Sequence, residues 1–265
     1  MLIVLWTLVL LSLLISVITA SGSLRTRQAG DYRRNAQLEA LADGGVEEGM
    51  FHLLDPSAPP RGGHWFADGA THSIRRGDVI LSIALVSEAG KINPNRATIP
   101  LLASLLQAVG ADGRTAAALA PSIVAWRFPG TPGTEYRAAG RDYLPPGAPF
   151  ESLSELGLVL GMTPQLVAAL EPHLSLYHDG DPDPAVADPV VRRALLAAGN
   201  VDPDTAPADA ASAGRNESVV TVTAEAQDAT GHRFLRRAII LTGQGGPASS
   251  DDHPFRVMSW DAPGA

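Results

Sequence analysis

The stretch MLIVLWTLVLLSLLISVITA, residues 1–20, contains no charged side chain and determines how the rest of the chain can be arranged. At about 1.5 Å of rise per residue, a helix of this length spans a hydrocarbon core of roughly 30 Å. We therefore predict a transmembrane helix over residues 1–20. A cleaved secretory signal peptide is the alternative, but such a peptide has basic residues before its apolar run, and none precedes this one.

Residues 21–55 continue the helical pattern beyond the apolar stretch. No proline interrupts them, and apolar side chains recur at roughly helical spacing. The prolines and glycines of residues 55–63 predict the end of the helix. The pair Gly44-Gly45 predicts a bend or a close approach to another element, because each glycine weakens a helix by roughly 1 kcal/mol relative to alanine.

The apolar face of this second helical part has two possible uses. Four residues form it: Leu38, Leu41, Val46 and Met50. We predict that this face contacts another subunit. Packing against a sheet of the same chain is the alternative.

Strand patterns lie on both sides of a long helical region. Residues 73–86 are rich in β-branched and apolar side chains, which predicts one long strand or a pair of strands. Residues 218–226 and 233–242 are two more strand candidates, and the turn residues between them predict an antiparallel hairpin. Residues 92–199 repeat their apolar positions at helical spacing. The fold class is therefore α+β, a small antiparallel sheet with a large helical insertion.

Two parts of the helical region resemble each other. Residues 92–127 and 150–177 each read as a helix, a glycine-bearing turn and a second helix. This pattern is typical of SAM-like and helix-hairpin-helix modules, which often bind nucleic-acid phosphates. Residues 151–171 contain no Lys or Arg, however, and their glutamates would repel phosphate. We expect a packing role, with a membrane-anchored nucleic-acid receptor as the alternative.

Composition excludes several classes of function. The net charge of −8 argues against a nucleic-acid partner, since phosphate binding depends on clustered Lys and Arg. The chain has no cysteine, so it has neither disulfides nor thiolate metal sites. The histidines show no metal-ligand spacing, and no serine lies in a Gly-x-Ser-x-Gly pattern. We expect no enzymatic activity.

An ordered set of motifs spans most of the chain. They are MLIVLW at residues 1–6, EALADGGVE at 39–47, SEAGKINPN at 87–95, PFESLSEL at 149–156 and FRVMSW at 255–260. In this order they resemble the general secretion pathway protein K family, minor pseudopilins of type II secretion. The resemblance implies a pilin-like fold and an anchor in the bacterial inner membrane. It also implies a position at the pseudopilus tip, with the minor pseudopilins I and J as partners.

The resemblance also implies how the chain is divided. It implies a transmembrane helix over residues 1–20, a periplasmic continuation over 21–55, the first part of a pilin-like β domain over 56–91, an inserted helical domain over 92–212, and the last strands and tail over 213–265.

The resemblance implies a short basic leader that prepilin peptidase removes. The first basic residues here, Arg25 and Arg27, follow the apolar run, and the positive-inside rule applied to them alone would leave the body in the cytoplasm. We expect a basic leader upstream of Met1 to reverse that orientation. The acid that most pilin-like helices carry near their start is missing around residues 2–5, as it is in protein K.

An acidic run in the helical region is a candidate calcium site. It contains Asp179, Asp181, Asp183 and Asp188. Calcium prefers six to eight oxygen ligands, and the resemblance implies calcium in this domain, although without assigning ligands to these residues. The run is not an EF-hand loop, since Pro184 stands where glycine is required and Val190 where the bidentate glutamate is required. A solvated acidic loop is the alternative.

Overall fold

The computed structural model describes residues 2–54, 65–130, 133–200, 218–243 and 255–263, and within the first helix the side chains outside residues 15–28. The predicted domain boundaries at 55/56 and 212/213 therefore lie outside the described residues. The fold is α+β, as predicted: a five-stranded antiparallel sheet and several helices.

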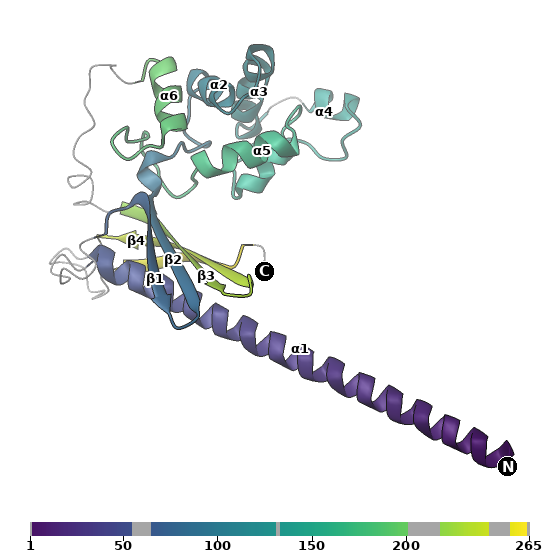
Figure 1. Cartoon of the computed structure of the whole chain (residues 1–265). Helices are drawn as coiled ribbons and strands as arrows, with labels where there is room; N and C mark the ends of the chain where they lie inside the picture. Colours follow the sequence, from purple (N-terminus) through teal and green to yellow (C-terminus); the bar gives the residue numbers. More distant parts are fainter. Residues whose placement is uncertain (1, 55–64, 131–132, 201–217, 244–254, 264–265) are drawn as a thin grey trace.

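Helix α1 (Leu2–Leu54) is continuous through both halves of the predicted N-terminal helix. Its first half projects away from the rest of the molecule, and its second half lies along the sheet (Figure 1). Within the described part of the chain, we find no helix with a stretch long and apolar enough to cross a membrane.

The sheet has the strand order β1-β2-β3-β4-β5. Its strands are β1 (Asp68–Arg76), β2 (Val79–Ser87), β3 (Ser218–Asp228), β4 (Arg233–Thr242) and β5 (Phe255–Asp261). Strands β1 and β2 form a tight hairpin whose turn contains Gly77 at φ +66°. Of the two alternatives for residues 73–86, one long strand or a pair of strands, the structure has the pair. The hairpin predicted from β3 and β4 is confirmed as well. Strands β2 and β3 pair directly although the whole helical region separates them in sequence.

The helical region lies between β2 and β3 in the sequence. Its elements are η1 (Glu88–Gly90), α2 (Ile99–Ala108), α3 (Gly113–Trp126), α4 (Thr134–Ala138), η2 (Leu153–Leu158), α5 (Pro164–Leu170), η3 (Glu171–His173) and α6 (Pro189–Ala197). The side chains of Thr98, Asp112, Thr163 and Asp188 accept backbone N–H bonds at helix starts, which satisfies donors that a helix leaves unpaired.

The two predicted helical hairpins have different outcomes. Helices α2 and α3 pack together as the first one. The second prediction is wrong in detail, because residues 153–158 form a short 3₁₀ helix and only α5 is α-helical. A capping box of Ser152 and Glu155 fixes the start of η2, and Gly161 at φ +88° lies in the turn that follows.

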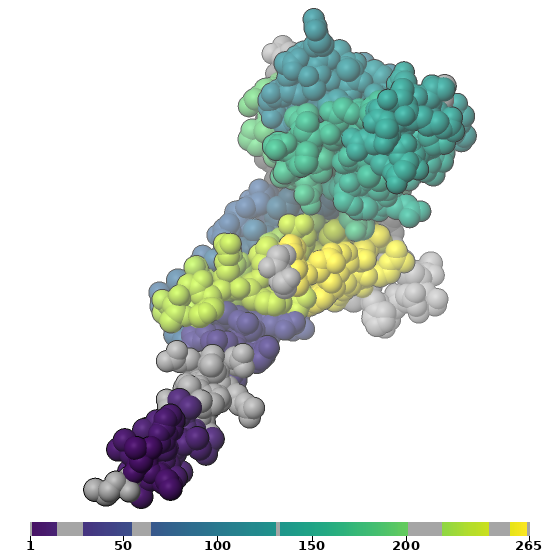
Figure 2. All heavy atoms as spheres, turned by 90° about the vertical axis from the view of Figure 1, so that its right-hand side faces the viewer, coloured from purple at the N-terminus to yellow at the C-terminus, as the bar shows by residue number. Residues whose placement is uncertain are grey.

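Two hydrophobic cores correspond to two lobes. One core lies between α1 and the sheet, and the other lies inside the helical region. Figure 2 shows the helical lobe standing beyond the sheet, with the first part of α1 on the opposite side. The junction between the two lobes is short. The contacts made there therefore determine how the helical lobe is attached to the sheet.

Helix α1 packs closely on the sheet through glycine. A Cβ on Gly45 would lie 2.9 Å from the Ala224 Cβ and 2.9 Å from a Leu81 methyl group, so only glycine permits this approach. Nothing lies within 4 Å of the corresponding point on Gly44. The close approach predicted from the glycine pair is therefore confirmed for one of its two members.

The last turn of α1 contacts β1 through a stack of rings. The buried Trp65 indole lies between the imidazoles of His52 and His72, with ring centroids 4.3 Å and 4.0 Å away. Because His52 belongs to α1 and His72 to β1, the stack joins the helix end to the edge of the sheet.

Candidate functional site

The junction between the lobes is built around a buried carboxylate. Glu88 follows β2 directly and is only 2% exposed. Its Oε1 accepts hydrogen bonds from the Thr221 hydroxyl and the Lys91 ammonium, both at 2.6 Å. A buried charge is stable only when it is paired and hydrogen-bonded, and this arrangement meets both conditions. Lys91 is the single lysine of the sequence.

Gly90 allows the acidic loop to pack directly on this turn. A Cβ at Gly90 would lie 2.5 Å from the Val186 carbonyl oxygen, a distance at which atoms clash. The neighbouring Ala89 carbonyl accepts the Asp183 N–H at 2.8 Å. Any side chain at position 90 would push this loop away from the sheet.

Two asparagines continue the junction into the helical lobe. Asn93 donates from Nδ2 to the His178 carbonyl at 2.7 Å. Asn95 exchanges two bonds with the backbone of Phe150, at 2.9 Å and 2.7 Å. The two side-chain amides thus satisfy backbone groups of His178 and Phe150, which lie far from them in sequence.

Arg127 supports the same segment from α3. Its guanidinium donates to the Pro94 carbonyl at 2.6 Å and to the Ala97 carbonyl at 2.9 Å. Burial lowers the pKa of Arg127. Residues 87–95 form one of the motifs that carry the family resemblance, but the sequence pattern indicated no role for Glu88, Asn93 or Asn95. The sequence feature that could have indicated this role is the single lysine, Lys91, three residues after Glu88 at the end of an apolar strand.

Away from the junction, ion pairs join α1 to strands β3 and β4 of the sheet. Arg236 of β4 donates to Glu39 at 2.7 Å and to Asp43 at 2.5 Å, and its guanidinium lies 5.7 Å from the centroid of the Trp260 ring. Arg34 bonds Asp228 at 2.5 Å.

The predicted subunit-contact residues lie inside the chain's own core. Leu38, Val46 and Met50 are at most 8% exposed, and Leu41 is partly buried against the same cluster. The structure has the alternative arrangement, in which these residues pack on the chain's own sheet. The predicted subunit contact through these residues is therefore wrong, because their side chains are already buried against the sheet. A contact between α1 and another subunit has to use another face of the helix.

The predicted calcium residues are dispersed. Both carboxylate oxygens of Asp188 are used: Oδ1 caps α6, and Oδ2 lies 2.8 Å from His173 Nδ1. Asp183 accepts the Ala185 N–H. Among the residues that the structure describes, no group of three or more His, Asp or Glu side chains is arranged to hold a metal ion. As placed, Asp179, Asp181, Asp183 and Asp188 do not form a calcium site.

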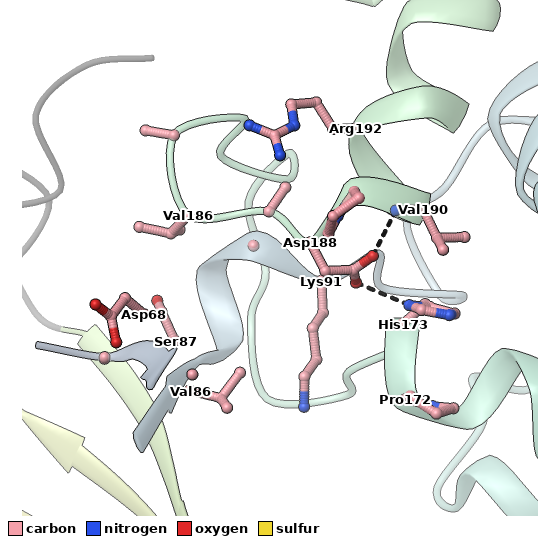
Figure 3. A pocket seen from close by; sticks show the side chains of 16 residues that line it. Asp68, Val86, Ser87, Lys91, Pro172, His173, Val186, Asp188, Val190 and Arg192 are labelled. Atoms are coloured by element: carbon pink, nitrogen blue, oxygen red, sulfur yellow. Dashed lines mark hydrogen bonds and ion pairs between the residues drawn. The ribbon is translucent and has the colours of Figure 1, made fainter. Parts of the chain in front are cut away.

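A pocket of about 610 Å³ lies where the β1–β2 end, the η1 turn and α6 meet. Figure 3 shows Asp68 and Ser87 on one side of it, with His173, Asp188 and Val190 on the other. Its walls are mostly apolar, with a small number of charged groups.

The comparisons with known proteins agree with this architecture. Residues 83–179 match the family model of the type II secretion system (T2SS), protein K. That segment starts inside β2 and contains the η1 turn and both asparagines.

The fold is shared with a solved structure. It is a chain in the crystal structure of the GspK-GspI-GspJ complex from the enterotoxigenic Escherichia coli type 2 secretion system. The TM-score is 0.58 at 15% sequence identity, and the match covers 91% of this chain and 100% of that chain. No curated protein sequence matches the chain. The comparisons thus show a match to type II secretion system protein K over residues 83–179 and a fold shared with the solved structure.

Proposed function

We propose that this chain is a minor pseudopilin at the tip of the type II secretion pseudopilus. There it starts assembly and supports the export of folded proteins across the outer membrane. The family match over residues 83–179 carries the proposal. A pilin-like arrangement supports it, since a long N-terminal helix lies on a small antiparallel sheet. The function is one of packing and assembly and not of catalysis.

The N-terminal part of α1 is proposed to anchor the protein in the inner membrane, with the rest in the periplasm. Every large apolar side chain described from Leu2 to Leu14 is at least 54% exposed. Exposed apolar area costs roughly 25 cal/mol per Å² in water, so a bilayer is a favourable environment for this segment. The uncharged sequence of residues 1–20 supports the same placement.

The place of the helical lobe supports the proposed tip position. The lobe lies on the other side of the sheet from the N-terminus of α1 (Figure 1). A further subunit stacked beyond the sheet would meet this lobe, so the chain is suited to end a filament and not to continue one.

The proposed partners are the minor pseudopilins I and J of the same secretion system. The chain with the shared fold comes from a GspK-GspI-GspJ complex, which supports a three-part assembly. No nucleic acid is expected to bind.

Co-purification tests the proposal. The full-length chain is co-expressed with full-length I and J proteins, extracted in detergent and analysed by native mass spectrometry. We expect a one-to-one-to-one complex, and preparations lacking I or J serve as controls. A chain that ignores both proteins but binds DNA with a steep salt dependence would favour the nucleic-acid receptor instead.

Calcium binding stays a prediction. The aspartates as placed do not form a site, so binding would require the loop of residues 179–188 to rearrange. A rise in melting temperature at millimolar calcium, lost in Asp179→Asn/Asp181→Asn, would support it, since a ligand stabilises the state that binds it. An unchanged melting temperature would argue for the solvated loop.

A further inference from the structure

The pocket between β1 and α6 has the size and walls of a binding site. About 610 Å³ is within the range of sites that hold several side chains. Gly69 and Gly90 present backbone and no side chain on its walls, and Val86, Val186 and Val190 supply apolar surface. An elongated ligand with apolar groups fits such walls better than a compact polar one.

In the part of the chain that the structure describes, some of the charged side chains around the pocket have partners of opposite charge and others do not. The Lys91 ammonium is paired with Glu88, and Asp188 is occupied by His173 and by the start of α6. Asp68 accepts the Ala70 N–H. Within the described residues, the guanidinium of Arg192 makes no hydrogen bond or ion pair. The Asp68 carboxylate on the β1 side likewise has no ion pair among the described residues. The charge left available on the α6 side of the pocket is positive, and there it complements a carboxylate.

An open strand edge adjoins the pocket. In the described sheet, β1 pairs only with β2, so its other edge has unpaired backbone groups. Its pairing is irregular between Asp68 and Thr71, at the end that lines the pocket. Edge strands of this kind accept an extended peptide through main-chain hydrogen bonds, while adjacent pockets select its side chains.

We propose that the pocket and the adjoining edge of β1 bind an extended segment of a neighbouring subunit. The segment places apolar side chains in the pocket and a carboxylate against Arg192. The proposal rests on the assembly function proposed above and adds the chemistry of the contact. An extended peptide is favoured over a small molecule because the start of β1, whose outer edge is open in the described sheet, lines the pocket.

Two blocked, fluorescent hexapeptides test this proposal on the full-length chain in detergent. One alternates Val and Glu, and the other alternates Val and Lys. At about 0.05 M salt, where charge interactions are weakly screened, fluorescence polarisation should show at least roughly tenfold tighter binding of the Glu peptide.

Matched variants locate the contact. Arg192→Glu should reverse the preference, whereas Arg193→Glu, at the exposed neighbouring position on α6, should change binding less than about twofold. Ala185→Trp, which fills the pocket without changing charge, should abolish binding of both peptides. Unchanged melting temperatures confirm that the variants fold.

The outcomes separate this proposal from the assembly function. No saturable binding of the Glu peptide up to about millimolar concentration, or equal losses in Arg192→Glu and Arg193→Glu, overturns the pocket contact. If the complex with I and J still forms, the assembly function stands without it. If the peptide binds as expected but no complex forms, the assembly function falls and the binding site remains.

Discussion

Thr221 of β3 donates its hydroxyl to Glu88 Oε1 at 2.6 Å, although 133 residues separate them in sequence. The same oxygen accepts the Lys91 ammonium. One carboxylate thus joins the sheet to the first turn of the helical lobe. This contact is positioned to control how the two lobes are held together.

Glu88→Gln should lower stability by about 1–3 kcal/mol, because the Lys91 ammonium would lose its counter-charge in a mostly buried place. Thermal unfolding followed by circular dichroism measures the change. Glu225→Gln, at a more exposed pair with Arg233 at 3.9 Å, is the control and should cost less than about 0.5 kcal/mol. Equal effects at the two positions would show that the buried contact contributes nothing special.

Adjacent glycines of α1 should respond with opposite sign. Gly44→Ala should stabilise by about 0.5–1 kcal/mol, since alanine is the better helix former and nothing lies nearby. Gly45→Ala should destabilise by about 1–3 kcal/mol through overlap with Ala224 and Leu81. Denaturant midpoints of both variants provide the measurement. Stabilisation by both substitutions would mean that the helix has room to move off the sheet.

Arg236→Lys should destabilise by about 1–3 kcal/mol, because an ammonium cannot bond Glu39 and Asp43 in the same fixed geometry. It would also alter the contacts of the guanidinium with the Phe234 and Trp260 rings, which lie 5.1 Å and 5.7 Å from it. Arg237→Lys is the control, since position 237 points to the other face of the strand and is more exposed. Thermal unfolding of both variants checks the prediction, which fails if they melt together.

Acid should weaken the attachment of α1 to the β3–β4 turn. Arg34, with help from Thr230, holds the pKa of Asp228 well below its usual range. A lowered folded-state pKa contributes stability that is present above the unfolded pKa, about 3.9, and that is lost as the pH falls toward the folded value.

Asp228→Asn should therefore lower the melting temperature at neutral pH and flatten its fall below about pH 4. A series of melting temperatures from neutral to acidic pH tests this. Arg34→Gln should produce the same change in part, because the Thr230 bonds to Asp228 remain. An acid limb identical to that of the unmodified chain in both variants would rule out this ion pair as the cause.

The elements that depend on local pattern were predictable. The long helix, the β3–β4 hairpin and the α+β class follow from periodicity and turn residues, which act over a few neighbouring positions. The 3₁₀ helix at residues 153–158 was missed, because helical spacing in so short a segment does not distinguish helix types.

The site was less predictable than the fold. Residues 87–95 were recognisable as a motif, but the partners of Glu88 and Asn95 lie far along the chain at Thr221 and Phe150. The calcium prediction relied on proximity in sequence. Asp188 instead caps a helix and pairs with His173, a use that depends on where the loop folds back.

The sequence alone determined that an uncharged apolar segment begins a long helix, and that a helical block interrupts a set of strands, because hydrophobic spacing and turn chemistry are local properties. Only the tertiary structure decided which face of that helix is used. Leu38, Val46 and Met50 are apolar whether they meet a sheet or another subunit, and the choice depends on the surface that folding brings against them. Because Gly45 has no side chain, the sheet can approach α1 closely, and these three side chains are buried against the chain's own strands.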